Sequence, residues 1–196
     1  TYNRGKVLYK ASISKMVKDI QTKQGLKETF DSGKHMMDWY DGFFPYMQKK
    51  FGAEAALVTD FIAITSPQAN LNLNIGFGLK AYSQYKLGEE FSAGRYPVEM
   101  RKRLNNAVKN FENGTNLPIG GAKVSNFSAA LKGDPNAVVL DMWMAREFGF
   151  KGDTLTDAQY RRYEQVVKEL AFQEGKTPRQ FQAGVWFGIR EGHSPM

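Results

Sequence analysis

Apolar residues recur every three or four positions along most of the chain, which is the period of helices packed on a core. The pattern predicts helices over residues 12–24, 27–51, 53–64, 97–111, 122–131, 156–173 and 178–190. We expect Pro45 to bend or break the second of these, because proline removes a backbone donor inside a helix. The sequence therefore predicts an all-α fold of about eight to ten helices.

Segment 71–79 is ambiguous between helix and strand. Leu71, Leu73, Ile75, Phe77 and Leu79 alternate strictly with other residues, which is the period of a half-buried strand. Leu71, Ile75 and Leu79 also fit the spacing of one helix face. Because the chain offers no convincing partner strand, a strand here would leave its backbone groups unpaired. We therefore predict a helix.

Two helix starts carry specific capping signals. Thr156 is followed three residues later by Gln159, and Thr177 by Gln180, which is the spacing of a capping box. No segment repeats at a fixed period and no linker divides the chain. We expect one compact domain over residues 1–196, with basic N-terminal helices at 1–52, a core at 53–150 and C-terminal helices at 151–196.

Composition narrows the possible chemistry. The 196 residues are 42% apolar, which suffices for one core, and they include no cysteine. The lack of cysteine excludes disulfides, thiolate nucleophiles and iron-sulfur clusters within this chain. With only two histidines, His35 and His193, we expect no metal and no cofactor. No apolar run approaches the roughly 20 residues of a membrane span, so we expect a soluble cytoplasmic protein.

Positive charge is unevenly distributed along the chain. Lys and Arg number 27 against 20 Asp and Glu, and residues 1–50 carry +5 of the net charge of +7. A second basic cluster, Arg101-Lys102-Arg103, lies on a predicted helix. This distribution is typical of proteins that bind polyanions such as nucleic acids. Basic residues on helices can also simply form a solvated surface that binds no anion specifically. Charge alone leaves both interpretations open.

The clearest candidate chemistry lies in residues 117–125, LPIGGAKVS, and in residues 138–146, VVLDMWMAR. Glycines in a loop between two helices let the backbone approach closely, and the amides that open the second helix can face a phosphate. Lys123 stands two residues after the last glycine, in the first turn of that helix. This arrangement is typical of a helix-hairpin-helix. Asp141 is expected to cap a further helix that begins at Met142.

The two segments resemble the helix-hairpin-helix DNA glycosylase superfamily, the group typified by endonuclease III. The family pattern is L-P-G-V-G-x-K-T-A, then a linking helix, then V-D-T-H-V-x-R. Gly121 falls on the second glycine of the pattern, and Lys123 falls on the lysine of the bifunctional members. Asp141, 18 residues after Lys123, falls on the aspartate, and Arg146 falls on the arginine. The resemblance implies a compact all-α glycosylase-like fold with its hairpin at residues 117–131.

An upstream segment adds to the resemblance. Residues 62–69, IAITSPQA, are similar to the family segment L-L-S-A-Q-A, whose glutamine wedges into DNA near the flipped base. The match implies that role for Gln68. The S-P-Q triplet, together with K-V-x-N-F and L-D-x-W-M-A-R, also resembles a phage-encoded branch of the glycosylase fold. Related phage enzymes of this fold are implicated in thymine hypermodification.

The chain departs from the family pattern at several positions. Ile119 replaces the first hairpin glycine, and Gly120 stands where valine is usual. Met142 and Trp143 replace the threonine and histidine that follow the aspartate. If residue 119 keeps a positive φ, isoleucine is strained there and the hairpin is reshaped.

The resemblance implies a catalytic pair, Lys123 and Asp141. The Lys123 amine would attack C1′ of an extruded nucleotide and form a Schiff base. Asp141 would deprotonate the nucleophile and stabilise positive charge on the sugar, and Trp143 would line the base pocket. The candidate DNA contacts are Gln68, Arg101, Lys102, Arg103, Gly120, Gly121 and Arg146. Each catalytic candidate has a structural alternative: Lys123 as a solvated lysine, Asp141 as a plain helix cap and Trp143 as a core residue.

The first functional hypothesis is a DNA glycosylase, with or without AP lyase activity, that excises a damaged or modified base from double-stranded DNA. One alternative is a phage enzyme of the same fold, in the host cytoplasm, that modifies hydroxymethyl-type thymine in DNA. A second alternative is a DNA-binding module without catalysis. In each case we expect the protein to act as a monomer.

Overall fold

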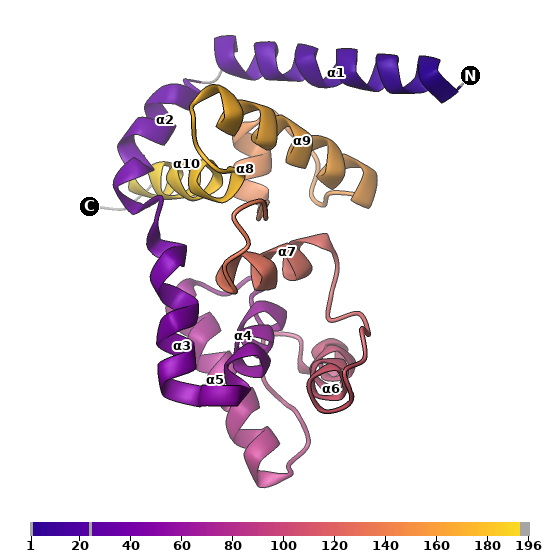
Figure 1. The fold of residues 1–196 in the computed structure, drawn as a ribbon, viewed down its shortest axis with the longest axis vertical. Coiled ribbons are helices and arrows are strands. Elements are labelled where there is room, and N and C mark those ends of the chain that lie inside the picture. Colours follow the sequence, from indigo (N-terminus) through magenta and orange to yellow (C-terminus); the bar gives the residue numbers. More distant parts are fainter. Residues whose placement is uncertain (1, 24, 193–196) are drawn as a thin grey trace. The chain divides into compact units, whose positions relative to one another are not determined.

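The computed structural model describes residues 2–23 and 25–192, which form ten α-helices and three short 3₁₀ helices and contain no strand (Figure 1). The all-α prediction and the helical prediction for residues 71–79 are confirmed. The chain divides into two compact units: a terminal unit, Thr1–Trp39 with Pro135–Met196, and a central unit, Tyr40–Asp134. The predicted segments 1–52 and 53–150 each contribute to both units, and the expectation of a single domain stays a prediction.

The terminal unit is built around its last helix. Its elements are α1 (Tyr2–Lys23), α2 (Leu26–Gly33), η1 (Lys34–Met36), α8 (Met142–Glu147), α9 (Asp157–Gln173) and α10 (Pro178–Gly192). Helix α10 packs along α2 and also contacts η1, α8 and α9, while α1 contacts α9. Phe30 of α2 stacks on Phe181 of α10, with the ring centroids 5.1 Å apart. Helix α1 buries Ile13, Val17 and Ile20.

The crossing of α2 and α10 requires glycine. A Cβ atom added at Gly188 would lie 1.9 Å from the carbonyl oxygen of Thr29. A Cβ atom added at Gly33 would lie 2.0 Å from the carbonyl oxygen of Gly184. Both neighbours are backbone atoms in a close-packed interior and have little room to move aside. The two helices therefore approach as closely as they do only because both sides lack a side chain.

The central unit is built around α4. Its α-helices are α3 (Phe43–Phe51), α4 (Ala55–Ile64), α5 (Leu71–Leu87), α6 (Pro97–Asn113) and α7 (Ala122–Leu131), and η3 (Gly52–Glu54) precedes α4. Helix α4 contacts α3, α5, α6 and α7, and most of its residues are buried. Asp60 of α4 accepts hydrogen bonds from Ser128 Oγ at 2.6 Å and Lys132 Nζ at 2.7 Å. This carboxylate fixes α7 on α4.

Two predicted helix bounds are wrong. Helix α1 begins at Tyr2 instead of residue 12. The continuous helix predicted over 27–51 is interrupted by η1 and by η2 (Trp39–Gly42), and α3 begins only at Phe43. The break therefore comes before Pro45, not at it. Pro45 lies in the first turn of α3, where no intrahelical partner exists for a backbone N–H.

Helix α5 packs through small and polar residues instead of its alternating leucines. Its buried residues are Asn74, Gly78, Ala81 and Gln84. A Cβ atom at Gly78 would lie 2.4 Å from Cγ1 of Ile62 on α4. At Gly78, α5 therefore approaches α4 closely because no side chain stands between the helix backbone and Ile62.

In the part of the chain that the structure describes, no helix has both the length and the apolar character required to cross a membrane.

Candidate nucleic-acid interface

The predicted site residues are divided between the two units. Lys123 belongs to the central unit and Asp141 to the terminal unit, so the two members of the predicted catalytic pair lie in different units. Seven predicted residues belong to the central unit: Gln68, Arg101, Lys102, Arg103, Gly120, Gly121 and Lys123. Three belong to the terminal unit: Asp141, Trp143 and Arg146.

The loop that joins α6 to α7 is held in place by asparagine side chains of α6. Asn110 Oδ1 accepts a hydrogen bond from the Leu117 amide at 2.7 Å, and Asn110 Nδ2 donates to the Leu117 carbonyl at 2.9 Å. One turn earlier, Asn106 Nδ2 donates to the Pro118 carbonyl at 2.8 Å. Neither asparagine was predicted as a site residue from the sequence. Their spacing of four residues before a loop was the available signal.

Glycine serves a different purpose in this loop from the one expected. Ile119, Gly120 and Gly121 all have φ outside the left-handed region, so the strain considered for Ile119 does not arise. A Cβ atom at Gly120 would lie 2.6 Å from Cβ of Val124 in α7. Gly120 is therefore required for space, because the loop folds down against the first turn of α7. A Cβ atom at Gly121 would meet nothing within 4 Å.

The start of α7 is suited to an anion. Its N-cap, Gly121, offers no side-chain hydrogen bond, and the first turn contains no acidic residue. The first backbone N–H groups of a helix have no intrahelical partner and carry partial positive charge. Lys123 adds a full positive charge in that turn, is half-buried, and makes no hydrogen bond or ion pair with the described residues. Backbone amides and a lysine at a helix start can together bind a phosphate.

The Gln68 loop between α4 and α5 holds the one strained backbone position among the described non-glycine residues. Gln68 has φ of 54° and is exposed. Ser66, two residues earlier, is 8% exposed, and its hydroxyl has no hydrogen-bond partner. Asn70 ends the loop by accepting a hydrogen bond from the Leu73 amide at 2.9 Å, which caps α5. A residue held in the left-handed region costs stability and is often found at functional loops.

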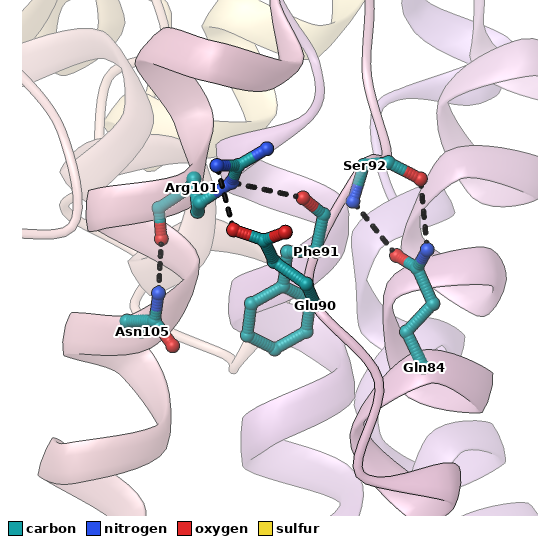
Figure 2. A network of polar contacts seen from close by, with 6 residues as sticks. All are labelled: Gln84, Glu90, Phe91, Ser92, Arg101 and Asn105. Carbon is teal, nitrogen blue, oxygen red and sulfur yellow. Dashed lines mark hydrogen bonds and ion pairs between the residues drawn. The ribbon is translucent and has the colours of Figure 1, made fainter.

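Arg101 already makes two polar contacts with the loop between α5 and α6 (Figure 2). Its Nη1 lies 2.7 Å from Glu90 Oε1, and its Nε donates to the Phe91 carbonyl at 3.2 Å. Gln84 of α5 holds the same loop from the other side, because its amide both donates to and accepts from Ser92, at 2.8 and 3.0 Å. Arg101 thus attaches the loop between α5 and α6 to α6. Of the predicted basic triplet, Lys102 is exposed and Arg103 is half-buried.

Asp141 caps α8, as predicted. Its Oδ1 accepts a hydrogen bond from the Met144 amide at 2.9 Å. Its Oδ2 accepts one from Trp186 Nε1 of α10 at 2.8 Å. The carboxylate is therefore held between two elements of the terminal unit. This role of Trp186 was not predicted, since no local sequence pattern relates two residues 45 positions apart.

Two tryptophan rings of the terminal unit each have an arginine guanidinium next to them. The Arg190 guanidinium lies 4.7 Å from the ring centroid of Trp186, and that of Arg146 lies 6.0 Å from the ring of Trp143. Trp143 is 57% exposed, so it is not a core residue. An exposed aromatic ring beside an arginine is a surface on which a nucleic-acid base can stack.

The described residues contain no group of three or more His, Asp or Glu side chains placed to hold a metal ion. His35 Nε2 lies 3.0 Å from Glu191 Oε1. His193 lies outside the described residues.

The fold and the site define an all-helical protein with an exposed, anion-suited loop between α6 and α7. The chain belongs to a family of unknown function, DUF7178, whose profile matches residues 12–193. No curated protein and no solved structure matches the chain.

Proposed function

We propose that the protein binds duplex DNA through α6, its loop and α7, and excises a base as a helix-hairpin-helix DNA glycosylase does. One observation carries this proposal: a loop pinned by Asn106 and Asn110 leads into a helix whose first turn has free amides and Lys123. Free amides, a nearby lysine and the absence of acidic residues in that turn favour a phosphate group over other ligands.

The loop is preorganised for binding by contacts within the protein. Three hydrogen bonds hold Leu117 and Pro118 to α6, and α7 is fixed to α4 through Asp60. A loop that is already ordered loses little conformational entropy when it binds a ligand. In this proposal, the loop and the first turn of α7 bind a phosphate without a rearrangement of the central unit.

In the proposed reaction, the bond between C1′ of the sugar and the base nitrogen breaks. In the hydrolytic route the oxygen of a water molecule replaces the base nitrogen on C1′. The departing base takes up a proton from that water. In the lyase route the Lys123 amine attacks C1′ instead, and opening of the sugar gives a Schiff base. The Asp141 carboxylate would stabilise the positive charge that develops on the sugar.

Two further predicted residues have surroundings that support their proposed roles. Gln68 is exposed on a strained loop, which is consistent with insertion into the space that an extruded base leaves. Trp143 offers an exposed ring with Arg146 beside it, which is consistent with stacking on the extruded base.

A second function is favoured by the surroundings of Asp141. Both oxygens of this carboxylate already accept hydrogen bonds, from a backbone amide and from Trp186. Such a carboxylate is fully accounted for as a structural cap. The protein would then be a DNA-binding module without base excision.

The test is borohydride trapping together with measurement of released base, on duplexes that carry uracil, a mismatch, an oxidised base or a hydroxymethylated base. The variants are Lys123→Gln and Asp141→Asn, with Lys80→Gln, an exposed lysine of α5, as the matched control. Asparagine is also a good N-cap residue, so Asp141→Asn should keep α8 while removing the charge.

A covalent adduct that requires Lys123, and that Lys80→Gln retains, would support the lyase route. Free base without an adduct, lost in Asp141→Asn, would support hydrolysis. DNA binding without either product would favour the non-catalytic module. A protein that neither binds nor cleaves any of these duplexes would refute the proposal.

A further inference from the structure

The outward face of α6 carries positively charged side chains that belong neither to the α6–α7 loop nor to the first turn of α7. Residues on this face line a shallow open depression: Val98, Arg101, Lys102, Asn105, Asn106 and Lys109. We propose that Lys102 and Lys109 on this face bind phosphates of the same DNA duplex that the loop grips. This inference rests on the proposed function and deepens it, because it assigns the α6 contact to two particular lysines and to the phosphates of a duplex.

The two lysines form a row along the helix. They are seven residues apart, which is close to two helical turns and about 10.5 Å along the axis. Both side chains are exposed. The phosphates of a duplex are spaced about 3.4 Å per strand along its axis, so a row of this length spans roughly three base steps.

The charges on this face are unequal in availability. Arg101 is paired with Glu90 and hydrogen-bonded to the Phe91 carbonyl, so its guanidinium already has partners in the protein. Lys102 and Lys109 make no hydrogen bond or ion pair with the described residues. Their binding to phosphate would break no existing contact, whereas recruitment of Arg101 would release the loop that it holds.

The depression is linked to the loop before α7 through Asn106. Asn106 lines the depression, and its Nδ2 also donates to the Pro118 carbonyl at 2.8 Å. Both features belong to the central unit. A DNA strand that contacts the loop can therefore extend over α6 without leaving this surface.

The chemistry of the lining favours the backbone of a duplex. No aromatic ring lines the depression, and its polar groups are lysine, arginine and asparagine side chains. Proteins that bind single strands usually stack bases on aromatic rings, which this face does not offer. Lysine and asparagine contacts to phosphates need no access to the bases.

The experiment measures how the affinity for an undamaged fluorescent duplex depends on salt, between about 50 and 200 mM, by anisotropy. The test variant is Lys102→Gln with Lys109→Gln. The control is Lys49→Gln with Lys80→Gln, which removes the same charge from exposed lysines of α3 and α5 in the same unit. Lys123→Gln is measured beside them, and circular dichroism checks that each variant is folded.

Each lost phosphate contact lowers the slope of log affinity against log salt by about 0.9. The test variant should therefore lose about 1.8 from the slope, so that its affinity falls about 12-fold less than that of the wild type over this salt range. The control should keep the wild-type slope. The same duplex should also bind more tightly than its single strand.

Three results would overturn the inference while leaving the proposed function standing. The first is a wild-type slope in the test variant, although Lys123→Gln lowers the slope. The second is an equal loss in the control, which would mean that only net charge matters. The third is a slope lowered by the test variant only on single-stranded DNA. If the wild-type protein binds no DNA, the proposed function fails and the inference fails with it.

Discussion

Two glycines of α5 should respond in opposite ways to the same substitution. Gly76 and Gly78 lie two residues apart inside one helix, so alanine improves helix propensity at both by about 0.5–1 kcal/mol. A Cβ atom at Gly76 would meet nothing within 4 Å. A Cβ atom at Gly78 would lie 2.4 Å from Ile62 Cγ1 and 3.1 Å from the Ile62 backbone. The pair therefore separates packing from propensity.

The expected magnitudes follow from these contacts. Gly76→Ala should stabilise the protein by about 0.5–1 kcal/mol, because only the propensity term changes. Gly78→Ala should carry an overpacking cost of about 1–3 kcal/mol, because Ile62 is itself buried and has little freedom to move. The two variants should therefore differ by about 1–3 kcal/mol, which corresponds to a Tm difference of about 2–12 °C for a chain of this size.

The assay has to report on the central unit. All three tryptophans, Trp39, Trp143 and Trp186, belong to the terminal unit. Far-UV circular dichroism during urea denaturation, combined with amide hydrogen exchange in α4 and α5, is therefore preferable to tryptophan fluorescence. Gly78→Ala should cost less when it is introduced into an Ile62→Ala background than into the wild type, because the opposing Cγ1 is then absent. Equal stability of Gly76→Ala and Gly78→Ala would refute the close approach of α5 to α4.

Three further predictions concern the other contacts. Trp186→Phe keeps an aromatic ring but removes the donor to Asp141, and should lower the free energy of unfolding by about 1–3 kcal/mol in urea denaturation. Asn110→Ala should accelerate amide exchange in the loop before α7, whereas Asn105→Ala, which loses only a bond within α6, should not. Gly188→Ala should cost at least about 1–3 kcal/mol, measured by tryptophan fluorescence, since its Cβ meets backbone; an unchanged midpoint would contradict the α2–α10 crossing.

Helix ends that depend on neighbouring residues were predictable from the sequence. The capping boxes at Thr156 and Thr177 are both present, and Asp141 caps α8 as expected. Each of these caps is an interaction within one helical turn, so the two residues that make it are only three positions apart in the sequence. The pattern over 71–79 was also interpreted correctly, because the absence of partner strands decided what periodicity alone left open.

The interruption over residues 34–42 was not predictable in the same way. This stretch continues an apparently helical pattern, but the structure folds it as η1 and η2, short 3₁₀ turns, before α3 begins. Helix propensity and hydrophobic periodicity predict secondary structure poorly where tertiary contacts determine the conformation of a segment. Pro45 then falls in a position where proline is tolerated, so it was a misleading signal for the break.

The contacts that define the candidate site were decided by tertiary structure. Trp186 lies 45 residues from Asp141, and Asp60 lies 68 residues from Ser128, yet each pair is joined by a hydrogen bond. The division of Lys123 and Asp141 between two units was equally invisible in the spacing of the motifs.

The sequence by itself determined the all-helical class, the caps and the basic character of α6, because each depends on residue type within a turn or two. Only the tertiary structure decided which charges are already paired, where glycine is needed for space and which donors hold Asp141. These properties depend on residues that are distant in the sequence and become neighbours when the helices pack.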